Sequence, residues 1–319
     1  MAADPHAPRL NLQHRLAAVL AIAAGAAVIE MLGSWWSGSL ALLSDAGHVG
    51  TDAVAVGLSL AALRLSERPH TPRMSFGYHR VEVLAALVNA LLLAAIASFL
   101  TLQAYGRLAN PQAVAGGTMF AVGLVGLAAN VTMVALLRNW ARRNINIRGA
   151  FLHAYADALG STGVVVGAIL IAVTNLVAFD SIVALFIIFL IIVSALRLLR
   201  DSVRIILEAS PADLQPKDIA LAILDVPAVR GVHDLHVWTM TSGLYVLTGH
   251  LSVGGDMSIQ QAAKIVDAVR ERLRDRFGIT HATLQVDSLQ EEMIPSADVT
   301  RRDDAQPAVT SDRGRADRE

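Results

Sequence analysis

Six long apolar runs constrain this chain more than any other feature of its sequence. They cover roughly Leu16–Trp35, Leu40–Leu63, Val81–Tyr105, Val114–Leu137, Ala150–Leu176 and Ile182–Leu199. Each run is close to the length of about 20 residues that an α-helix needs to cross a bilayer. Hydrophobic residues make up 54% of the 319-residue chain, which is too many for an ordinary soluble domain. The sequence therefore predicts six membrane-spanning helices.

Basic residues alternate between the connections of these runs. The even-numbered connections contain Arg64, Arg68, Arg73, Arg80, Arg138, Arg142, Arg143 and Arg148. The first and fifth connections have no basic residue, and the third has only Arg107. Because an excess of Lys and Arg marks cytoplasmic loops, we expect both termini on the cytoplasmic side.

Beyond about residue 208 the pattern becomes that of a small α+β domain. We expect a helix from Pro216, strands over Val229–Met240 and Leu244–Val253, a helix after Ser258 and a strand over His281–Leu289. The order α-β-β-α-β predicts one sheet with helices on one face. The last residues are charged and poor in large apolar side chains, a composition typical of disorder. The predicted division is a cytosolic segment 1–14, a transmembrane domain 15–208, a cytosolic domain 209–294 and a disordered tail 295–319.

Two of the apolar runs contain the same pair, a His followed four residues later by an Asp. The pairs are His48 with Asp52 and His153 with Asp157. Residues i and i+4 share one face of a helix, and ionisable groups at membrane depth indicate a functional site. A single such residue can simply bond to a neighbouring helix, but two identical pairs favour a site of two nitrogens and two oxygens. This ligand set suits tetrahedral Zn²⁺ first, with Co²⁺, Cd²⁺ or Ni²⁺ as competitors.

Two further acidic residues lie in the spans. Asp45, three residues before His48, either orients that imidazole, relays protons or makes a plain helix-end contact. Glu30 in the first span either lines an outward cavity or stabilises the bundle. Ligands must lose protons to bind a metal, and His titrates near neutral pH. A site that faces the two sides of the membrane in turn would therefore exchange metal for protons.

The two spans that contain the His/Asp pairs enter the membrane from opposite sides. The second span enters from the outer side and the fifth from the cytoplasm, so His48 is expected near an outer end and His153 near an inner end. A common site then requires one helix to be displaced along the membrane normal, or span boundaries that differ by several residues.

Other features exclude several classes of protein. A net charge of −1 provides no general basic field for binding nucleic acid. The chain has no cysteine, so disulfides and thiolate metal sites are excluded. The sequence has no H-E-x-x-H motif, which argues against an intramembrane metalloprotease. We expect no enzymatic activity.

Several motifs resemble the cation diffusion facilitator family of zinc transporters. They are Ser75–Asn89, Asp45–His48, Arg148–His153 and Gly231–Trp238, within a resemblance that covers about residues 14 to 290. The resemblance implies a homodimer with a cytosolic ferredoxin-like regulatory and dimerisation domain. It also implies proton-coupled export of divalent metal from the cytoplasm across a bacterial inner membrane. It assigns His48, Asp52, His153 and Asp157 to the transport site, in its zinc-preferring form.

The resemblance implies a second zinc site in the cytosolic domain, at His233, His250 and Asp287. The family sometimes has a further His where this chain has Gln285, and Gln is a poor zinc ligand, so fewer ions are expected. The alternative is a polar dimer face with structural histidines.

His70 and His79 lie in the second connection. They form either a peripheral zinc site or part of a solvated basic loop near lipid headgroups. For the whole protein, the alternative to a transporter is a membrane metal sensor that signals through its cytosolic domain without transport.

Overall fold

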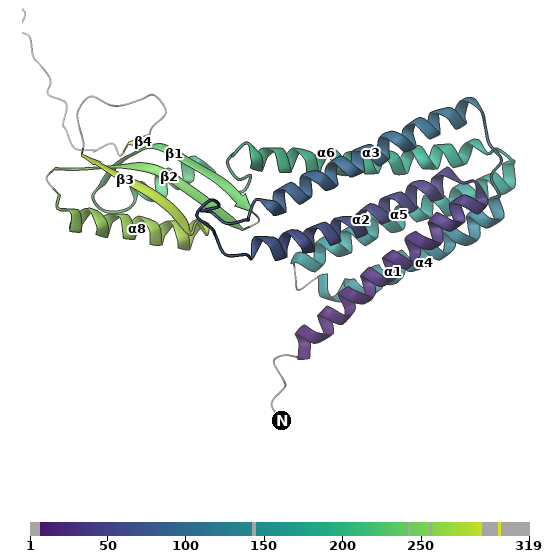
Figure 1. The fold of residues 1–319 in the computed structure, drawn as a ribbon, viewed down its shortest axis with the longest axis horizontal. Helices are drawn as coiled ribbons and strands as arrows, with labels where there is room; N and C mark the ends of the chain where they lie inside the picture. Colours follow the sequence, from purple (N-terminus) through teal and green to yellow (C-terminus); the bar gives the residue numbers. More distant parts are fainter. Residues whose placement is uncertain (1–6, 142–144, 242, 256, 289–298, 301–319) are drawn as a thin grey trace, which may run out of the picture. The chain divides into compact units, whose positions relative to one another are not determined.

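The computed structural model describes residues 7–141, 145–241, 243–255, 257–288 and 299–300. The chain forms two compact units, Met1–Arg204 and Ile205–Glu319 (Figure 1). Residues 1–6 of the predicted N-terminal segment lie outside the described part, and the first helix already begins at Ala7.

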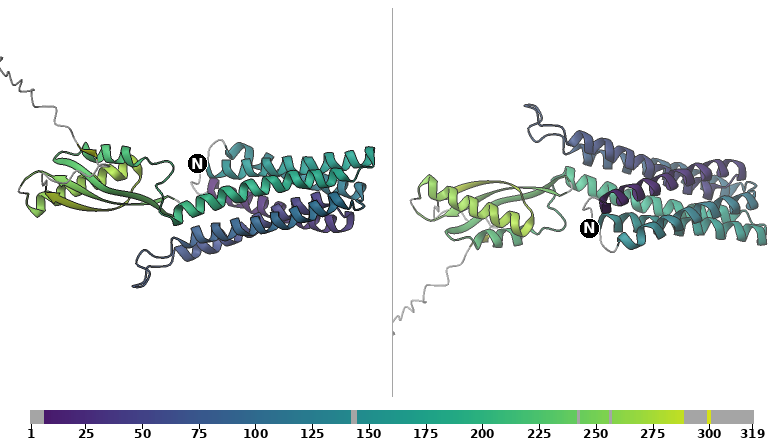
Figure 2. Two further views of the ribbon diagram at one scale, coloured as in Figure 1. Left: turned by 90° about the horizontal axis from the view of Figure 1, so that it is seen from above. Right: turned by 90° about the horizontal axis from the view of Figure 1, so that it is seen from below.

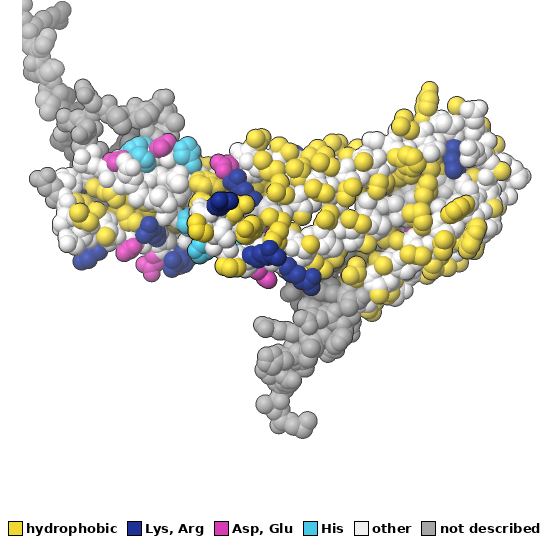
Figure 3. Space-filling model, viewed as in Figure 1, with side chains coloured by type: hydrophobic (Ala, Val, Ile, Leu, Met, Phe, Trp, Pro, Cys, Tyr) yellow, Lys and Arg dark blue, Asp and Glu magenta, His cyan; other side chains and the backbone are white. Residues whose placement is uncertain are grey.

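The first unit contains the six predicted spans as long helices in its described residues. They are α1 (Ala7–Ser37), α2 (Leu40–Ser66), α3 (Val81–Ala109), α4 (Gly116–Ala141), α5 (Ile145–Thr174) and α6 (Ala178–Ile206). Each contains a stretch long and apolar enough to cross a membrane. On the face shown in Figure 3, hydrophobic side chains cover most of these helices, with few charged side chains between them. The prediction of six membrane helices is confirmed.

The helices approach one another closely because small residues lie at the contacts. Helix α1 packs against α2 and α4, and α4 packs against α5 (Figures 1 and 2). A Cβ atom at certain glycines would come within 3.0 Å of a neighbouring side chain, so only glycine fits there. Three such contacts join Gly33 with Val122, Gly123 with Val164 and Gly167 with Val183. Since lipid is as apolar as a Leu side chain, van der Waals packing of this kind drives helix association in a bilayer.

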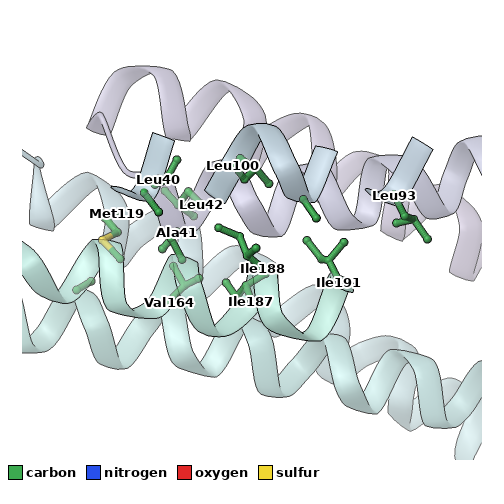
Figure 4. Packing of buried hydrophobic residues seen from close by; sticks show 14 of the residues in the cluster. Leu40, Ala41, Leu42, Leu93, Leu100, Met119, Val164, Ile187, Ile188 and Ile191 are labelled. Carbon is green, nitrogen blue, oxygen red and sulfur yellow. The ribbon is translucent and has the colours of Figure 1, made fainter. Parts of the chain in front are cut away.

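The largest apolar cluster of the described residues extends from the first turn of α2 along α3 and α6, as far as Leu93 and Ala195. In Figure 4 the labelled side chains come from α2, α3, α4, α5 and α6 and lie between these helices. Its most deeply buried members are Leu40, Ala41, Leu42, Ala104, Met119, Val164, Ala184 and Ile191. The cluster therefore closes the bundle at the end where α2 begins.

A buried carboxylate fixes the same end of the bundle. Asp180 of α6 is 1% exposed and accepts hydrogen bonds from Ser39 Oγ (2.5 Å), Leu40 N (2.7 Å) and Ala41 N (3.2 Å). Arg107 Nη1 of α3 lies 3.6 Å from Asp180 Oδ2 and donates to the carbonyl oxygen of Gly38. The free N–H groups of a helix N-terminus favour a carboxylate. Asp180 thus joins the start of α2 to α3 and α6, and Arg107 is an interhelical residue rather than a loop charge.

The second unit is an α+β domain. Its elements are α7 (Pro216–Leu224), β1 (Val229–Thr241), β2 (Leu244–Val253), α8 (Ile259–Phe277), β3 (His281–Ser288) and β4 (Val299–Thr300). The sheet order is β3-β2-β1-β4, with β2 and β3 parallel and the other pairs antiparallel. Ile219, Ile223, Val269 and Leu273 of the two helices pack with strand residues in one core, so both helices cover the same sheet face. The predicted fold class is confirmed.

Among the elements of the described residues, strand β4 is the one that the sequence did not predict. It pairs with β1 through Val299 and Thr300, inside the tail predicted to be disordered. The other residues from 295 onward lie outside the described part. Two paired residues carry no hydrophobic alternation long enough to indicate a strand.

Candidate metal centre

The four side chains of the two His/Asp pairs meet between α2 and α5. His153 Nε2 lies 3.0 Å from Asp52 Oδ2, and His48 Nε2 lies 3.5 Å from Asp157 Oδ1. Within each helix the distances are longer, 3.9 Å from His48 to Asp52 and 3.7 Å from His153 to Asp157. Ligand atoms around a tetrahedral Zn²⁺ lie about 3.3 Å apart, as bond lengths of about 2.0–2.1 Å require. His48, Asp52 and Asp157 each offer one ligand atom within 4.8 Å of the others, as ligands of one metal ion would, and His153 adjoins this group through its 3.0 Å contact with Asp52.

The register of the two helices explains why these pairs meet. Residues later in α2 face residues earlier in α5, so the helices run antiparallel. Eight residues of α2 precede His48, whereas seventeen residues of α5 follow Asp157. The two helices are thus displaced along their axes, as a common site required. Helix α5 also begins at Ile145, before the expected Ala150.

The site is closed on one side and open on the other. Side-chain exposure rises from 7% at Asp157 and 15% at His48 to 28% at Asp52 and 50% at His153. Ser44 and Asp45, one turn toward the start of α2, are buried. Within the described residues, His48 Nδ1 and Asp157 Oδ1 have no hydrogen-bond partner. Two buried ligand atoms therefore make no hydrogen bond that a cation entering from the open side would have to replace.

A chain of hydrogen bonds holds Asp45 beside the site. Asn130 Nδ2 of α4 donates to Ser161 Oγ of α5 (2.9 Å), and Ser161 Oγ donates to Asp45 Oδ2 (2.8 Å). The interhelical bond of Asp45 thus goes to Ser161. Sequence reasoning missed Ser161, although it lies four residues after Asp157 on the same helix face.

The two histidines of the second connection do not join a cluster. His70 and His79 lie between α2 and α3, where Thr71 and Met74 form an isolated bridge. Among the described residues, neither belongs to a group of three ligating side chains. The structure therefore provides no support for the predicted loop site.

The cytosolic candidates do come together, on three adjacent strands. His250 Nδ1 of β2 lies 2.9 Å from Asp287 Oδ2 of β3, and His233 Nε2 of β1 lies 3.3 Å from the same oxygen. Gln285 Nε2 donates to Asp287 Oδ1 (2.9 Å). This hydrogen bond, together with that from His250, lowers the pKa of the Asp287 carboxyl below its ordinary value of 3.8. These side chains project from the sheet face opposite the helices, because His250 alternates with the core residue Leu251.

Asp234 is an acidic neighbour of this cluster that the sequence did not reveal. It has φ +50° at an irregularity of β1, where the pairing with β2 shifts between His233 and His236. Its carboxylate lies 3.0 Å from His236 Nε2 and 3.8 Å from His250 Nε2. A β-bulge redirects side chains in a way that strict alternation does not predict.

The sequence matches models of known families over nearly its whole length. Residues 16–207 match the cation efflux transmembrane domain, and residues 211–289 match the cation efflux protein cytoplasmic domain. The chain is 35% identical over 306 residues to the metal cation efflux system protein CzcD of Cupriavidus metallidurans, covering 95% of each chain. It is 37% identical over 284 residues to the zinc transporter ZitB of Escherichia coli K12, covering 88% of this chain and 90% of the relative. A cadmium, cobalt and zinc/H⁺-K⁺ antiporter of Bacillus velezensis is 34% identical over 266 residues, or 83% of this chain and 85% of the relative.

Proposed function

The chain belongs to the cation efflux family, also called cation diffusion facilitators, and we propose that it exports Zn²⁺ from the cytoplasm in exchange for protons. This is a family of membrane transporters, and six apolar helices indicate an integral membrane protein. The proposal concerns the transported ion, the coupled ion and the residues that bind them.

The observation that carries the proposal is the meeting of two imidazoles and two carboxylates between α2 and α5. Its closest contacts join His153 to Asp52 and His48 to Asp157, so each His faces an Asp of the other helix. Nitrogen and oxygen ligands without sulfur favour Zn²⁺, with Cd²⁺, Co²⁺ and Ni²⁺ as competitors. The names of the relatives agree, since they include a zinc transporter and a cadmium, cobalt and zinc antiporter.

The exposure of the site supports a direction of transport. The open side of the site faces the end of α2 at Ser66 and the start of α5 at Ile145, which adjoin the arginine-rich connections. If these connections are cytoplasmic, the site here accepts metal from the cytoplasm. The opposite side is closed by the apolar cluster and by Asp180 with its partners. Release outside then requires α2 to separate from α3 and α6 at this end.

Competition between Zn²⁺ and protons for the ligand atoms couples the export of metal to the entry of protons. Zn²⁺ binds neutral imidazole and ionised carboxylate, so a bound ion excludes protons from the same atoms. Protonation of the site on the acidic outer side therefore releases the metal, and deprotonation on the cytoplasmic side prepares the site for the next ion.

The cytosolic domain is proposed to dimerise the protein and to bind regulatory zinc. His233, His250 and Asp287 offer three ligand atoms within 4.8 Å of one another, which fits a three-ligand zinc site. A metal held there would connect β1, β2 and β3. Gln285 donates a hydrogen bond to Asp287 and adds no strong ligand. We place the protein as a homodimer in a bacterial inner membrane with both termini in the cytoplasm.

Transport in everted membrane vesicles tests the proposal. Vesicles with an acidic interior should accumulate Zn²⁺, and a proton carrier that removes the pH gradient should stop this accumulation. Asp157→Ala should reduce uptake to the level of vesicles without the protein, because it removes a buried ligand. The matched control Asp218→Asn changes an exposed acid on α7 and should transport normally. Absence of wild-type uptake, with zinc binding intact, would instead indicate a metal sensor.

A further inference from the structure

A group of polar contacts outside the metal site joins three helices at the end of the membrane unit where α2 begins. Asp180 of α6 accepts hydrogen bonds from Ser39 Oγ and from two backbone N–H groups in the first turn of α2. Arg107 of α3 lies beside Asp180 and donates to a carbonyl oxygen of the turn between α1 and α2. We call Asp180, Arg107 and the residues Ser39–Ala41 the latch.

Helix α6 depends on side chains for its attachment to the bundle. Extensive close contact of the backbones joins α1 to α2 and α4, α2 to α3, and α4 to α5. Within the described residues, α6 takes part in no contact of that extent. It is held by apolar side chains, among them Val183 against Gly167 of α5, and by the hydrogen bonds of Asp180. The latch is therefore the polar tie between α6 and α2.

The polar groups of the latch suit a contact that opens and closes. A buried ionised carboxylate needs hydrogen-bond donors, and Asp180 finds them in the start of α2. Water that enters at this end can replace those donors, which limits the cost of opening. Arg107 Nε is buried and has no hydrogen-bond partner within the described residues, so entering water would also satisfy this group. The closed latch is thus well bonded at Asp180 and incomplete at Arg107.

The latch lies in line with the metal site along α2. Leu40, Ser44 and His48 follow one another at intervals of four residues, so they share one face of the helix. From Leu40 to His48 the distance along the helix axis is about 12 Å, at about 1.5 Å per residue. Ser44 lies between them and is fully buried. A metal ion that leaves His48 along this face toward the start of α2 therefore meets the latch.

We infer that the latch is the outer gate of the transport cycle. While Asp180 holds the start of α2, the metal site is open only to the cytoplasmic side, and release outside requires these hydrogen bonds to break. The inference rests on the proposed export, which assigns this end of the bundle to the outer side. Asp180 is a positioning residue here, because it acts through the place of α2 and contacts no metal ligand.

Thiol labelling tests this role, since the chain has no cysteine of its own. Ser44→Cys places a single thiol between the latch and the site. A membrane-impermeant methanethiosulfonate is applied to right-side-out and to everted vesicles, with a chelator present because thiolates bind zinc. The buried thiol should react slowly from both sides. Adding Asp180→Asn should speed the reaction from the outer side at least about tenfold, as expected for a lost hydrogen bond to a charged group. The rate in everted vesicles should not change.

Ser66→Ala, combined with Ser44→Cys, is the matched control. It removes the hydrogen bond from Ser66 Oγ to Glu82 Oε1 (2.7 Å), which joins α2 to α3 at the opposite end. The outer rate should then stay at the Ser44→Cys value. Trp36→Cys alone places a thiol at a side chain that is 75% exposed near the latch, and it should react rapidly in right-side-out vesicles. A Trp36→Cys protein that reacts only in everted vesicles would overturn the proposed orientation and, with it, the outer gate.

The outcomes separate the gate from the proposed function. A folded Asp180→Asn protein with an unchanged outer rate would overturn the gate, and so would an equal rise from both sides, which indicates general loosening. Should Asp180→Asn fail to fold, adding Arg107→Gln leaves no unpaired charge, and the same rates decide. Labelling requires no zinc. A wild-type protein without zinc uptake, whose labelling still depends on Asp180, would overturn export alone, and normal uptake with labelling independent of Asp180 would overturn the gate alone.

Discussion

The protein uses imidazole and carboxylate groups twice, in two very different settings. In the membrane unit, His48 and Asp52 lie on α2, and their partners lie on α5. In the cytosolic unit, His233, His250 and Asp287 lie on three strands of one sheet. The same chemistry is thus attached to two helices in one case and to a hydrogen-bonded sheet in the other.

The difference decides how each cluster can respond to metal. Helices α2 and α5 are joined near the site by side chains, so they can shift and change the distances between ligands. In the sheet, His233 lies opposite His250, and β3 is paired with β2 along its whole length. Separating these ligands requires breaking a ladder of backbone hydrogen bonds, each of which contributes about 0.5–1.5 kcal/mol. A movable cluster suits a transported ion, and a fixed cluster suits a resident one.

The largest effects are expected from removing one imidazole from each cluster. The effect on transport should differ strongly between the two clusters. His153→Ala should weaken Zn²⁺ binding at the membrane site by more than about 100-fold, beyond the 10–100-fold typical of residues that only orient ligands. Transport should stop, because His153 makes the closest contact in the site, 3.0 Å to Asp52. Isothermal titration with Zn²⁺, Cd²⁺, Co²⁺ and Mn²⁺ measures the affinities.

His250→Ala is the matched variant in the sheet. It should abolish zinc binding at the proposed cytosolic site and leave uptake at saturating Zn²⁺ within about threefold of the wild type, since the proposed transport ligands are intact. Equal loss of transport in both variants would show that transport needs the cytosolic cluster as much as the membrane cluster, which contradicts the roles assigned to them.

The helices and the ligand pairs could be predicted because both follow local periodicity. Helices α2 and α3 begin at the expected Leu40 and Val81. Strand β2 has the expected bounds, Leu244–Val253. Apolar length reveals a membrane helix, and the i, i+4 spacing places His and Asp on one face.

Contacts between elements could not be predicted, because no local pattern encodes the register of two helices. That His48 faces Asp157 depends on the axial displacement of α5 relative to α2. The hydrogen bonds from Asn130 to Ser161 and from Ser161 to Asp45 depend on how α4 and α5 pack beside α2. Asp180 lies between the expected spans that end at Leu176 and begin at Ile182, yet it accepts a hydrogen bond from Leu40 N, at the start of a helix 140 residues earlier.

Adding a ligand to the fixed cluster should strengthen it without affecting transport. Gln285 pairs with His250 across the strands and already contacts Asp287. Gln285→His should therefore tighten cytosolic Zn²⁺ binding by at least about tenfold, or about 1.4 kcal/mol, because a third imidazole completes the ligand set. Competition with a chromophoric chelator measures the affinity. Thr283→His, two residues away on the same strand face, should give a smaller gain, and unchanged affinity in both variants would contradict the assigned geometry.

The smallest effect expected is on acid stability of the metal-free cytosolic domain. The hydrogen bond from Gln285 is the main cause of the lowered pKa of Asp287. A carboxyl group whose pKa is lowered by folding stabilises the folded state above its unfolded pKa, and this stabilisation is lost as the pH falls through the native pKa. For Asp287 the loss occurs below about pH 3.8.

Gln285→Ala should raise the native pKa of Asp287 and move acid unfolding to a higher pH by a fraction of a unit, as measured by circular dichroism with chelator present. Thr283→Ala should leave the midpoint unchanged, and a shift of Gln285→Ala to lower pH would refute the assignment. The membrane cluster should not respond to Gln285→Ala, so zinc uptake should stay at the wild-type rate.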